Sequence, residues 1–166
     1  MIALVRHASP LGELSLALRG DRICGLAWTD HFARVDRALT RRFRDAERTS
    51  GRAPTEMLHR LDAFFDGELA ALDGIPLDLR GTSFQRAVWE ALCKVPAGRT
   101  TTYAELARAA GAPTAVRAVG AANGANPVSL VVPCHRAIGT DGSLTGYAGG
   151  LDRKRWLLAH EGARFR

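Results

Sequence analysis

The stretch TYAELARAAGAPTAVRAVGAANG, residues 102–124, decides the architecture of the second half of this 166-residue chain. Thr102 is followed three residues later by Glu105, which is the spacing of a capping box, and Gly111 is a typical helix stop. A second helical segment opens at Pro113, a residue that suits the first turn of a helix. Two short helices joined by a tight glycine-containing turn predict a helix-turn-helix. Helices that only pack together, with no DNA to bind, are the alternative.

The second of these helices is unusual for one that reads the major groove. Arg117 is its only long polar side chain, because most of its other residues are too small to reach base edges. One arginine on a slim helix suits a minor groove and the space left by an extruded base. A solvated Arg117 on a helix of packing alanines is the alternative reading. The small residues considered are Thr114, Ala115, Ala118, Ala121 and Ala122.

Charge is unevenly distributed along the chain, whose net charge is +6. Residues 1–78 carry 11 arginines against 12 acidic residues, whereas residues 79–166 carry 12 basic residues against 5 acidic ones. A basic half attracts polyanions, of which nucleic acid is the commonest, although simple solubility would also explain it. The near-neutral first half argues against direct DNA binding there.

The first half reads as a small α/β lobe. Short alternating apolar runs separated by SPLG and GDR predict an antiparallel meander, and two amphipathic helices follow it, the first with Asp30 as its cap. We therefore expect an α/β protein of two lobes, with domains at 1–78 and 79–166, the second mostly helical. The expected strands are ALVRHA, GELSLALRG and ICGLAWT, the expected helices are residues 30–43, 54–69 and 83–95, and the expected linker is residues 72–82.

The cysteines and the apolar runs indicate where the protein works. Cys24, Cys93 and Cys134 are odd in number and widely spaced, which favours free thiols in a reducing compartment. No apolar run approaches the roughly 20 residues of a membrane span, and Arg6 and His7 interrupt the start too early for a secretory signal. We expect a cytoplasmic protein away from membranes, with Cys93 in a largely packed helix.

The segment VVPCHRAIG, residues 131–139, places Cys134 beside His135. A thiol becomes a strong nucleophile when a neighbour lowers its pKa. Consecutive residues of an extended chain point to opposite sides, so the pair needs a bridging water or a bend at Pro133. Glu161 is the best acceptor to orient the histidine, ahead of His160. A buried inert cysteine beside a structural histidine is the alternative.

A longer segment, NPVSLVVPCHRAIGTDGSLTGYAGG, closely resembles the active-site segment of the O6-alkylguanine-DNA alkyltransferases, the methylated-DNA–protein-cysteine methyltransferases. The resemblance runs from GTSFQRAVWEALCKVPAGRTTTYAELA through VRAVGAANGANP to WLLAHEG, and SPLGELSLA and GLAW extend it less specifically into the first lobe. It implies a ribonuclease H-like first lobe. It also implies a DNA repair protein that flips O6-alkylguanine, and O4-alkylthymine, out of duplex DNA through the minor groove. The alkyl group then passes irreversibly, once, to the protein's own cysteine without a cofactor.

The resemblance also assigns the reaction. Cys134 is the acceptor thiol, and His135 and Glu161 resemble the relay that forms the thiolate through a water. Asn126 resembles the residue that braces the active-site turn. Tyr103 resembles the one that crowds the target phosphate and protonates the leaving base.

The remaining assignments concern DNA and the base pocket. Arg117 resembles the finger that replaces the flipped nucleotide, with Ala115 and Thr114 where the helix meets the minor groove. The resemblance further implies a pocket walled by Tyr147, with backbone groups of Ala137 and Ala148 reading the base and Ser129 and Thr145 at the rim. A β-branched Thr145 should narrow the entrance. We expect no metal, because Cys24, His7, His31 and His59 do not match the zinc ligands of some family members.

Rival functions remain open. Non-catalytic relatives that bind alkylated bases lack the acceptor cysteine, whereas Cys134 is present. A helix-turn-helix regulator would bind a specific sequence without covalent change, and the alanine-rich helix argues against it. A thiol hydrolase would turn over repeatedly. We expect duplex DNA with alkylated guanine as the partner of a monomer that needs no other protein.

Overall fold

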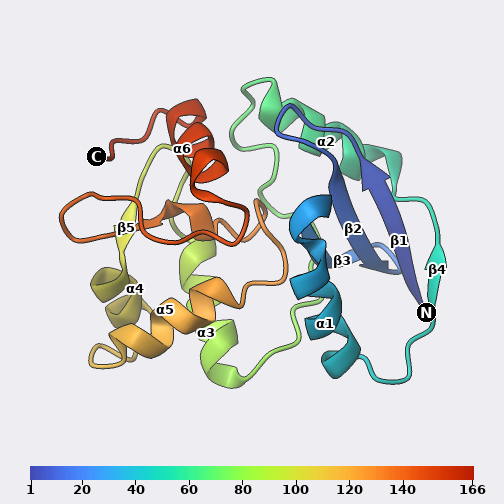
Figure 1. Cartoon of the computed structure of the whole chain (residues 1–166), viewed down its shortest axis with the longest axis horizontal. Coiled ribbons are helices and arrows are strands. Elements are labelled where there is room, and N and C mark those ends of the chain that lie inside the picture. Colours follow the sequence, from blue (N-terminus) through green and yellow to red (C-terminus); the bar gives the residue numbers. More distant parts are fainter. The chain divides into compact units, whose positions relative to one another are not determined.

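The computed structural model describes all 166 residues as two compact units, Met1–Arg80 and Gly81–Arg166 (Figure 1). The expected boundary lies two residues earlier, between residues 78 and 79. The predicted mixed α/β fold is confirmed by the small sheet and helices. No helix is long and apolar enough to cross a membrane.

The sheet of the first unit has the order β3-β2-β1-β4. The first three strands form the predicted antiparallel meander, with Gly20 at a positive φ of 60° in the β2–β3 turn. The fourth strand runs parallel to β1 and lies outside the expected meander. Its three residues are too few to show an alternating pattern, and no strand was expected there. The strands are β1 (Ile2–His7), β2 (Leu14–Arg19), β3 (Arg22–Trp28) and β4 (Arg48–Ser50).

Helix α1 (Phe32–Arg42) runs beside β3 and covers one face of the sheet (Figure 1). It packs so closely that a Cβ on Gly25 would lie 2.8 Å from Cγ1 of Val35. Asp30 does not cap this helix as expected. It lies in a 3-10 turn, η1 (Thr29–His31), which carries the chain directly into α1.

Helix α2 (Thr55–Phe65) is shorter than the expected 54–69, because Gly67 has a φ of 107° that ends helical geometry. The expected linker 72–82 is also partly built into this unit. Ile75 is buried. The Ile23 N–H donates to the Pro76 carbonyl at 2.9 Å, and the Asp78 N–H donates to the Ile23 carbonyl at 2.9 Å. The segment is therefore bridged to the edge strand β3 at Leu77.

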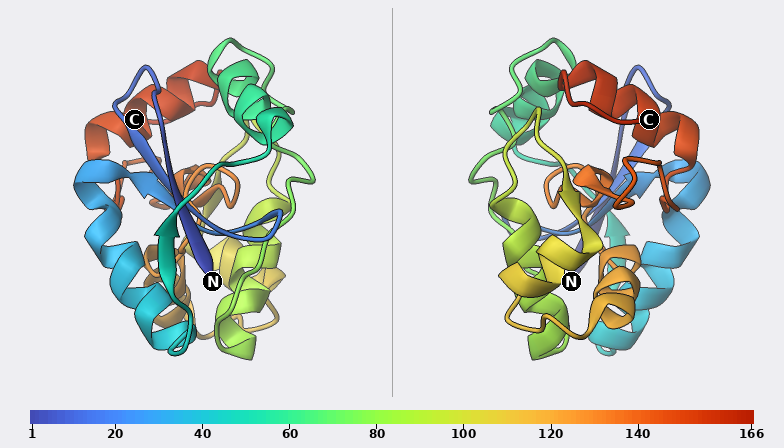
Figure 2. Two further views of the ribbon diagram at one scale, coloured as in Figure 1. Left: turned by 90° about the vertical axis from the view of Figure 1, so that its right-hand side faces the viewer. Right: turned by 90° about the vertical axis from the view of Figure 1, so that its left-hand side faces the viewer.

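The second unit begins with three helices that pack together, α3 (Ser83–Cys93), α4 (Tyr103–Ala109) and α5 (Val116–Gly124). They gather at one end of the unit, with α6 (Leu151–His160) at the other (Figure 2). Indole Nε1 of Trp89 in α3 donates to the carbonyl of Ala122 in α5 at 2.9 Å. A two-stranded parallel sheet joins β5 (Thr101–Thr102) to β6 (Ala137–Ile138).

The capping box at the start of α4 is present as predicted. The Thr102 N–H donates to Glu105 Oε2 at 2.7 Å, and the Glu105 N–H donates to Thr102 Oγ1 at 3.2 Å. However, α5 begins at Val116 and not at Pro113. The N–H of Ala115 donates to the carbonyl of Ala112 at 2.9 Å, which closes a turn around Pro113 before the helix starts. Ala115 therefore precedes the helix that it was expected to join.

Candidate active site

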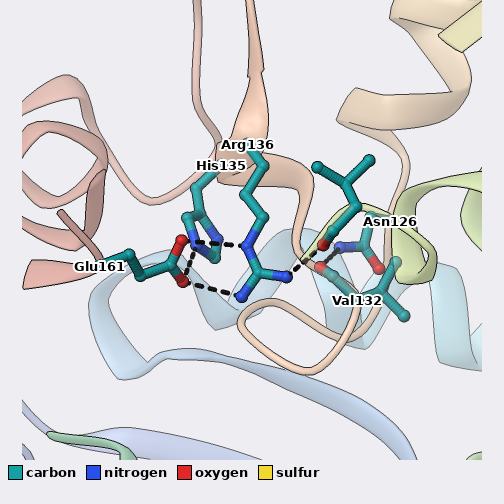
Figure 3. Close-up of polar contacts among 6 residues, drawn as sticks. Asn126, Val132, His135, Arg136 and Glu161 are labelled. Atoms are coloured by element: carbon teal, nitrogen blue, oxygen red, sulfur yellow. Dashed lines mark hydrogen bonds and ion pairs between the residues drawn. The ribbon is translucent and has the colours of Figure 1, made fainter. Parts of the chain in front are cut away.

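The loop before Cys134 is pinned by Asn126, whose side chain is 1% exposed. Its Nδ2 donates to the Val132 carbonyl at 2.9 Å (Figure 3). Its Oδ1 accepts from the Val128 N–H at 2.9 Å. Within this loop Leu130 has a φ of 70°, the only positive φ outside glycine in the chain. Such a conformation costs free energy and persists only where its surroundings impose it. The side chain of Asn126 supplies that constraint.

The chain bends at Pro133, where φ is −81° and ψ is 63°, into a 3-10 turn, η2 (Cys134–Arg136). One of the two arrangements expected for Cys134 and His135 was a bend at this proline, and the bend is present. Cys134 is 4% exposed and His135 is fully buried.

Three buried side chains form an ionic cluster behind this turn (Figure 3). His135 Nε2 lies 2.8 Å from Glu161 Oε1. Arg136 donates from Nη2 to Oε1 at 2.9 Å and from Nε to Oε2 at 3.0 Å, and its Nη1 donates to the Val95 carbonyl at 2.6 Å. The expected His135–Glu161 pair is therefore joined by Arg136, to which no role had been assigned from the sequence.

The cluster fixes where the protons lie. Burial acts to raise the pKa of Glu161, but hydrogen bonds from His135 and Arg136 outweigh it and hold the pKa at about 2. Burial lowers the pKa of His135 despite the opposing hydrogen bond and charge of Glu161. A neutral imidazole beside a carboxylate must donate from Nε2, so its Nδ1 is an acceptor. That Nδ1 is buried and has no hydrogen-bond partner within the protein.

Lys154 is a functional candidate that the sequence analysis missed. Its side chain is fully buried in α6, and Nζ donates to the carbonyls of Ala137 at 2.6 Å and Thr145 at 3.0 Å. Burial lowers its pKa to about 8, and the charge of Cys134 acts to raise it. Lys154 lies three and four residues before the buried Leu157 and Leu158, so helical spacing could have placed it on the buried stripe.

A hollow of about 590 Å³ lies between α4, α5 and the segment 145–148. Of the expected site residues, Tyr103, Arg117, Thr145 and Ala148 line it. Thr145 Oγ1 donates to Tyr103 Oη at 3.0 Å, which joins two sides of the hollow. Asn123, which the sequence analysis missed, also lines it, and its buried Oδ1 has no hydrogen-bond partner.

Other expected pocket residues lie outside this lining. Tyr147 sits edge-on to His135, with ring centroids 6.4 Å apart. The Ala137 carbonyl already accepts from Lys154. Ser129 is 2% exposed in the turn before Cys134 and does not line the hollow. Thr114 is exposed and Ala115 half-buried in the turn before α5.

The three cysteines differ in their surroundings, and none forms a disulfide. Burial raises the pKa of the Cys24 thiol to about 11, and its Sγ donates to the Ala17 carbonyl at 3.3 Å. Cys93 is exposed at the end of α3, contrary to the expectation of a packed position. Only Cys134 adjoins a histidine–carboxylate pair.

Fold and site together define a cysteine-dependent group-transfer protein built on a helix-turn-helix unit. Two family models match the chain: "6-O-methylguanine DNA methyltransferase, ribonuclease-like domain" at residues 6–79 and "6-O-methylguanine DNA methyltransferase, DNA binding domain" at residues 83–163. The chain belongs to the 6-O-methylguanine DNA methyltransferase family. The predicted family and class of activity are thereby confirmed.

Individual proteins agree with this membership. The methylated-DNA–protein-cysteine methyltransferase of Salmonella typhimurium is 46% identical over 158 residues, which cover 93% of this chain and 92% of the relative. The crystal structure of Mycobacterium tuberculosis O6-methylguanine methyltransferase has a TM-score of 0.80 at 42% identity, covering 98% and 93% of the two chains. A structure of the Mycobacterium tuberculosis protein OGT in complex with DNA has a TM-score of 0.83 at 43% identity, covering 95% and 91%.

Proposed function

We propose that this chain repairs DNA by taking an alkyl group from O6 of guanine onto the sulfur of Cys134. The observation that carries the assignment is the buried His135, whose Nε2 is fixed by Glu161 and whose Nδ1 remains an acceptor next to Cys134 in the chain. Incubation with a duplex containing O6-methylguanine, followed by intact mass measurement, tests it. The protein should gain the mass of one methyl group, and an unchanged mass would contradict the proposal.

The reaction begins with the thiol proton, which passes to His135 Nδ1 directly or through a water. Glu161 stabilises the imidazolium that results, because its carboxylate stays ionised. The thiolate attacks the alkyl carbon in line, so an S–C bond forms as the C–O bond breaks. Guanine leaves as an anion and takes a proton from Tyr103 Oη in the hollow. The phenolate is reprotonated by the imidazolium, which returns His135 to its neutral form.

The substrate must leave the DNA stack to reach Cys134, at a cost of a few kcal/mol. We propose that the hollow receives the flipped base and that Arg117 fills the space in the duplex. The exposed side of α5 suits a minor groove, because Ala118, Ala121 and Gly124 leave room for close approach. O4-alkylthymine is a second substrate on the same grounds.

The two units have different proposed roles. Residues 79–166 bind duplex DNA and carry the transfer site, and residues 1–78 support them. The DNA complex of the related Mycobacterium tuberculosis protein supports the assignment of DNA as partner. We further propose that the chain acts as a monomer in the cytoplasm, away from membranes and without an obligate protein partner.

We expect Arg117→Ala to slow repair of O6-methylguanine in duplex DNA about tenfold or more, because the extruded base is no longer replaced. Transfer from free O6-benzylguanine should remain nearly unchanged, since Arg117 takes no part in the sulfur chemistry. Single-turnover rates on both substrates measure the difference. The control is Arg155→Ala, which removes an exposed arginine from α6. Equal losses on free base and duplex would contradict the role of Arg117.

We expect Lys154→Met to slow transfer from free base about tenfold at pH 7, because a nearby ammonium favours the Cys134 thiolate. The difference from the native protein should shrink towards pH 9. There the thiol ionises unaided, and Lys154, with a pKa of about 8, has itself lost its charge. A rate profile over this pH range is the measurement, with Lys94→Met as the control at the chain's other, exposed lysine. A loss of equal size at every pH would indicate a structural role alone.

A further inference from the structure

A second hollow, of about 490 Å³, lies in the first unit near the end of α1. Five arginines line it, from three separate parts of the sequence: Arg19 ends β2, Arg41, Arg42 and Arg44 end or follow α1, and Arg80 closes the unit. We refer to it as the arginine hollow. It lies outside the helix-turn-helix unit that holds Cys134.

The charge of the arginine hollow is not a consequence of a basic unit. Residues 1–80 contain 12 arginines and 12 acidic residues, so their net charge is zero. Five of those arginines but only one of those carboxylates, Asp45, line the hollow. Even with Asp78, the partner of Arg19 and Arg80, the hollow keeps a net charge of +3. The fold therefore concentrates positive charge in one place, although the first unit as a whole is neutral.

Two of the guanidinium groups are held in place. Those of Arg19 and Arg80 lie over the ring of Phe43, with distances of 5.0 and 4.7 Å to its centroid. Phe43 is 7% exposed, so its ring is fixed by packing. Arg19 Nη1 donates a hydrogen bond to Asp78 Oδ2, and Arg80 Nε lies 3.8 Å from Asp78 Oδ1. These guanidinium groups lose less freedom when they bind a ligand than free side chains would.

The helix dipole explains only part of the cluster. Basic residues favour the last turn of a helix, which accounts for Arg41 and Arg42 at the end of α1. It does not account for Arg19 and Arg80, which come from other elements. Burial lowers the pKa of Arg42, and the charges of Arg41 and Arg34 lower it further. The fold therefore brings arginines of separate elements together with those of the helix end.

We infer that the arginine hollow binds phosphoryl groups. Guanidinium groups that converge from several elements match the geometry of phosphate oxygens, which accept paired N–H donors. The hollow is within the size range of small-ligand sites. The ligand is a phosphate ester or a polyphosphate, and its source is either the backbone of a DNA duplex or a free phosphate compound.

The experiment compares three forms of the full chain. Arg41→Ala/Arg44→Ala removes two exposed arginines of the hollow, and Arg37→Ala/Arg52→Ala removes two exposed arginines of the same unit outside it. Pyrophosphate binding is measured by calorimetry, and binding of an undamaged duplex is measured across a range of salt concentrations. Transfer from free O6-benzylguanine shows that each variant is folded.

If the source is free phosphate, native protein and the Arg37/Arg52 control should bind pyrophosphate saturably, and the hollow variant should bind it at least tenfold more weakly. If the source is DNA, only the hollow variant should lower the slope of log K against log salt, by about 0.9 for each DNA phosphate that is no longer neutralised. Either result supports the site. The inference is overturned if both double variants weaken binding equally, or if neither ligand distinguishes the hollow variant from native protein.

Discussion

Cys134→Ala is expected to abolish alkyl transfer completely while binding to duplex DNA persists. In the proposed mechanism the thiolate of Cys134 is the nucleophile, and an alanine has no atom to form the new bond to carbon. In the proposed function DNA binding rests on other groups, chiefly the exposed side of α5 and the basic residues of the second unit. Transfer is followed with an oligonucleotide carrying radiolabelled O6-methylguanine, and binding is followed by fluorescence anisotropy.

The same chemistry limits the native protein to one reaction. A thioether on Cys134 has no good leaving group and no polarised carbonyl for water to attack, unlike the acyl intermediate of a cysteine hydrolase. Product should therefore stop at one equivalent, with the added mass on the peptide that contains Cys134. Cys93→Ala is the matched control, because Cys93 is the exposed cysteine. Repair beyond one equivalent, or an adduct on Cys24 or Cys93, would overturn the mechanism.

Glu161→Gln is expected to lower the free energy of unfolding at pH 7 by about 3–5 kcal/mol, the usual cost of breaking a buried ion pair. The amide leaves the buried guanidinium of Arg136 without its counter-charge. The amide also no longer stabilises the charged form of His135 as the carboxylate does, so transfer from free base should slow by about 100-fold. Urea denaturation and single-turnover rates, measured where the variant is folded, separate the two effects.

The pH dependence gives this prediction a second readout. The folded pKa of Glu161 is about 2, below its ordinary value of 4.5. The carboxylate therefore stabilises the folded state fully above about pH 4.5, and this stability is lost as the pH falls towards 2. The stability difference between native protein and Glu161→Gln should narrow over that interval. Glu90→Gln, at an exposed carboxylate of α3, should show no such effect, and a constant difference would contradict the assigned ion pair.

The predictions for the second unit that the structure confirms were based on residues close together in the sequence. The Thr102–Glu105 capping box depends on residues three apart, and Gly111 needs only its own freedom at positive φ, which is 75° in the structure. The pairing of His135 with Glu161 spans a longer separation, and it was inferred because a carboxylate is the best acceptor to orient an imidazole, with the family resemblance in agreement. Element ends were less predictable, because the turn around Pro113 competes with the helix that proline could have started.

The features that the sequence did not indicate share a different cause. The β4 strand is made by its partner β1, and a three-residue segment shows no pattern of its own. Lys154 and Arg136 look like surface charges in basic runs, yet both are buried and bonded to distant groups.

The sequence by itself determined the helix-turn-helix, the reactive cysteine segment and the family, because these depend on near neighbours or on motifs read in order. Only the tertiary structure decided that Arg136 completes the His135–Glu161 cluster, that Lys154 is buried and donates to the Ala137 carbonyl, and that five arginines of a neutral unit share one hollow. The physical reason is that burial and electrostatic interaction depend on distance in space. Burying a charged side chain alone costs free energy, and the cost is offset when the fold brings a bonding partner next to it. The order of residues along the chain does not show which residues become such partners.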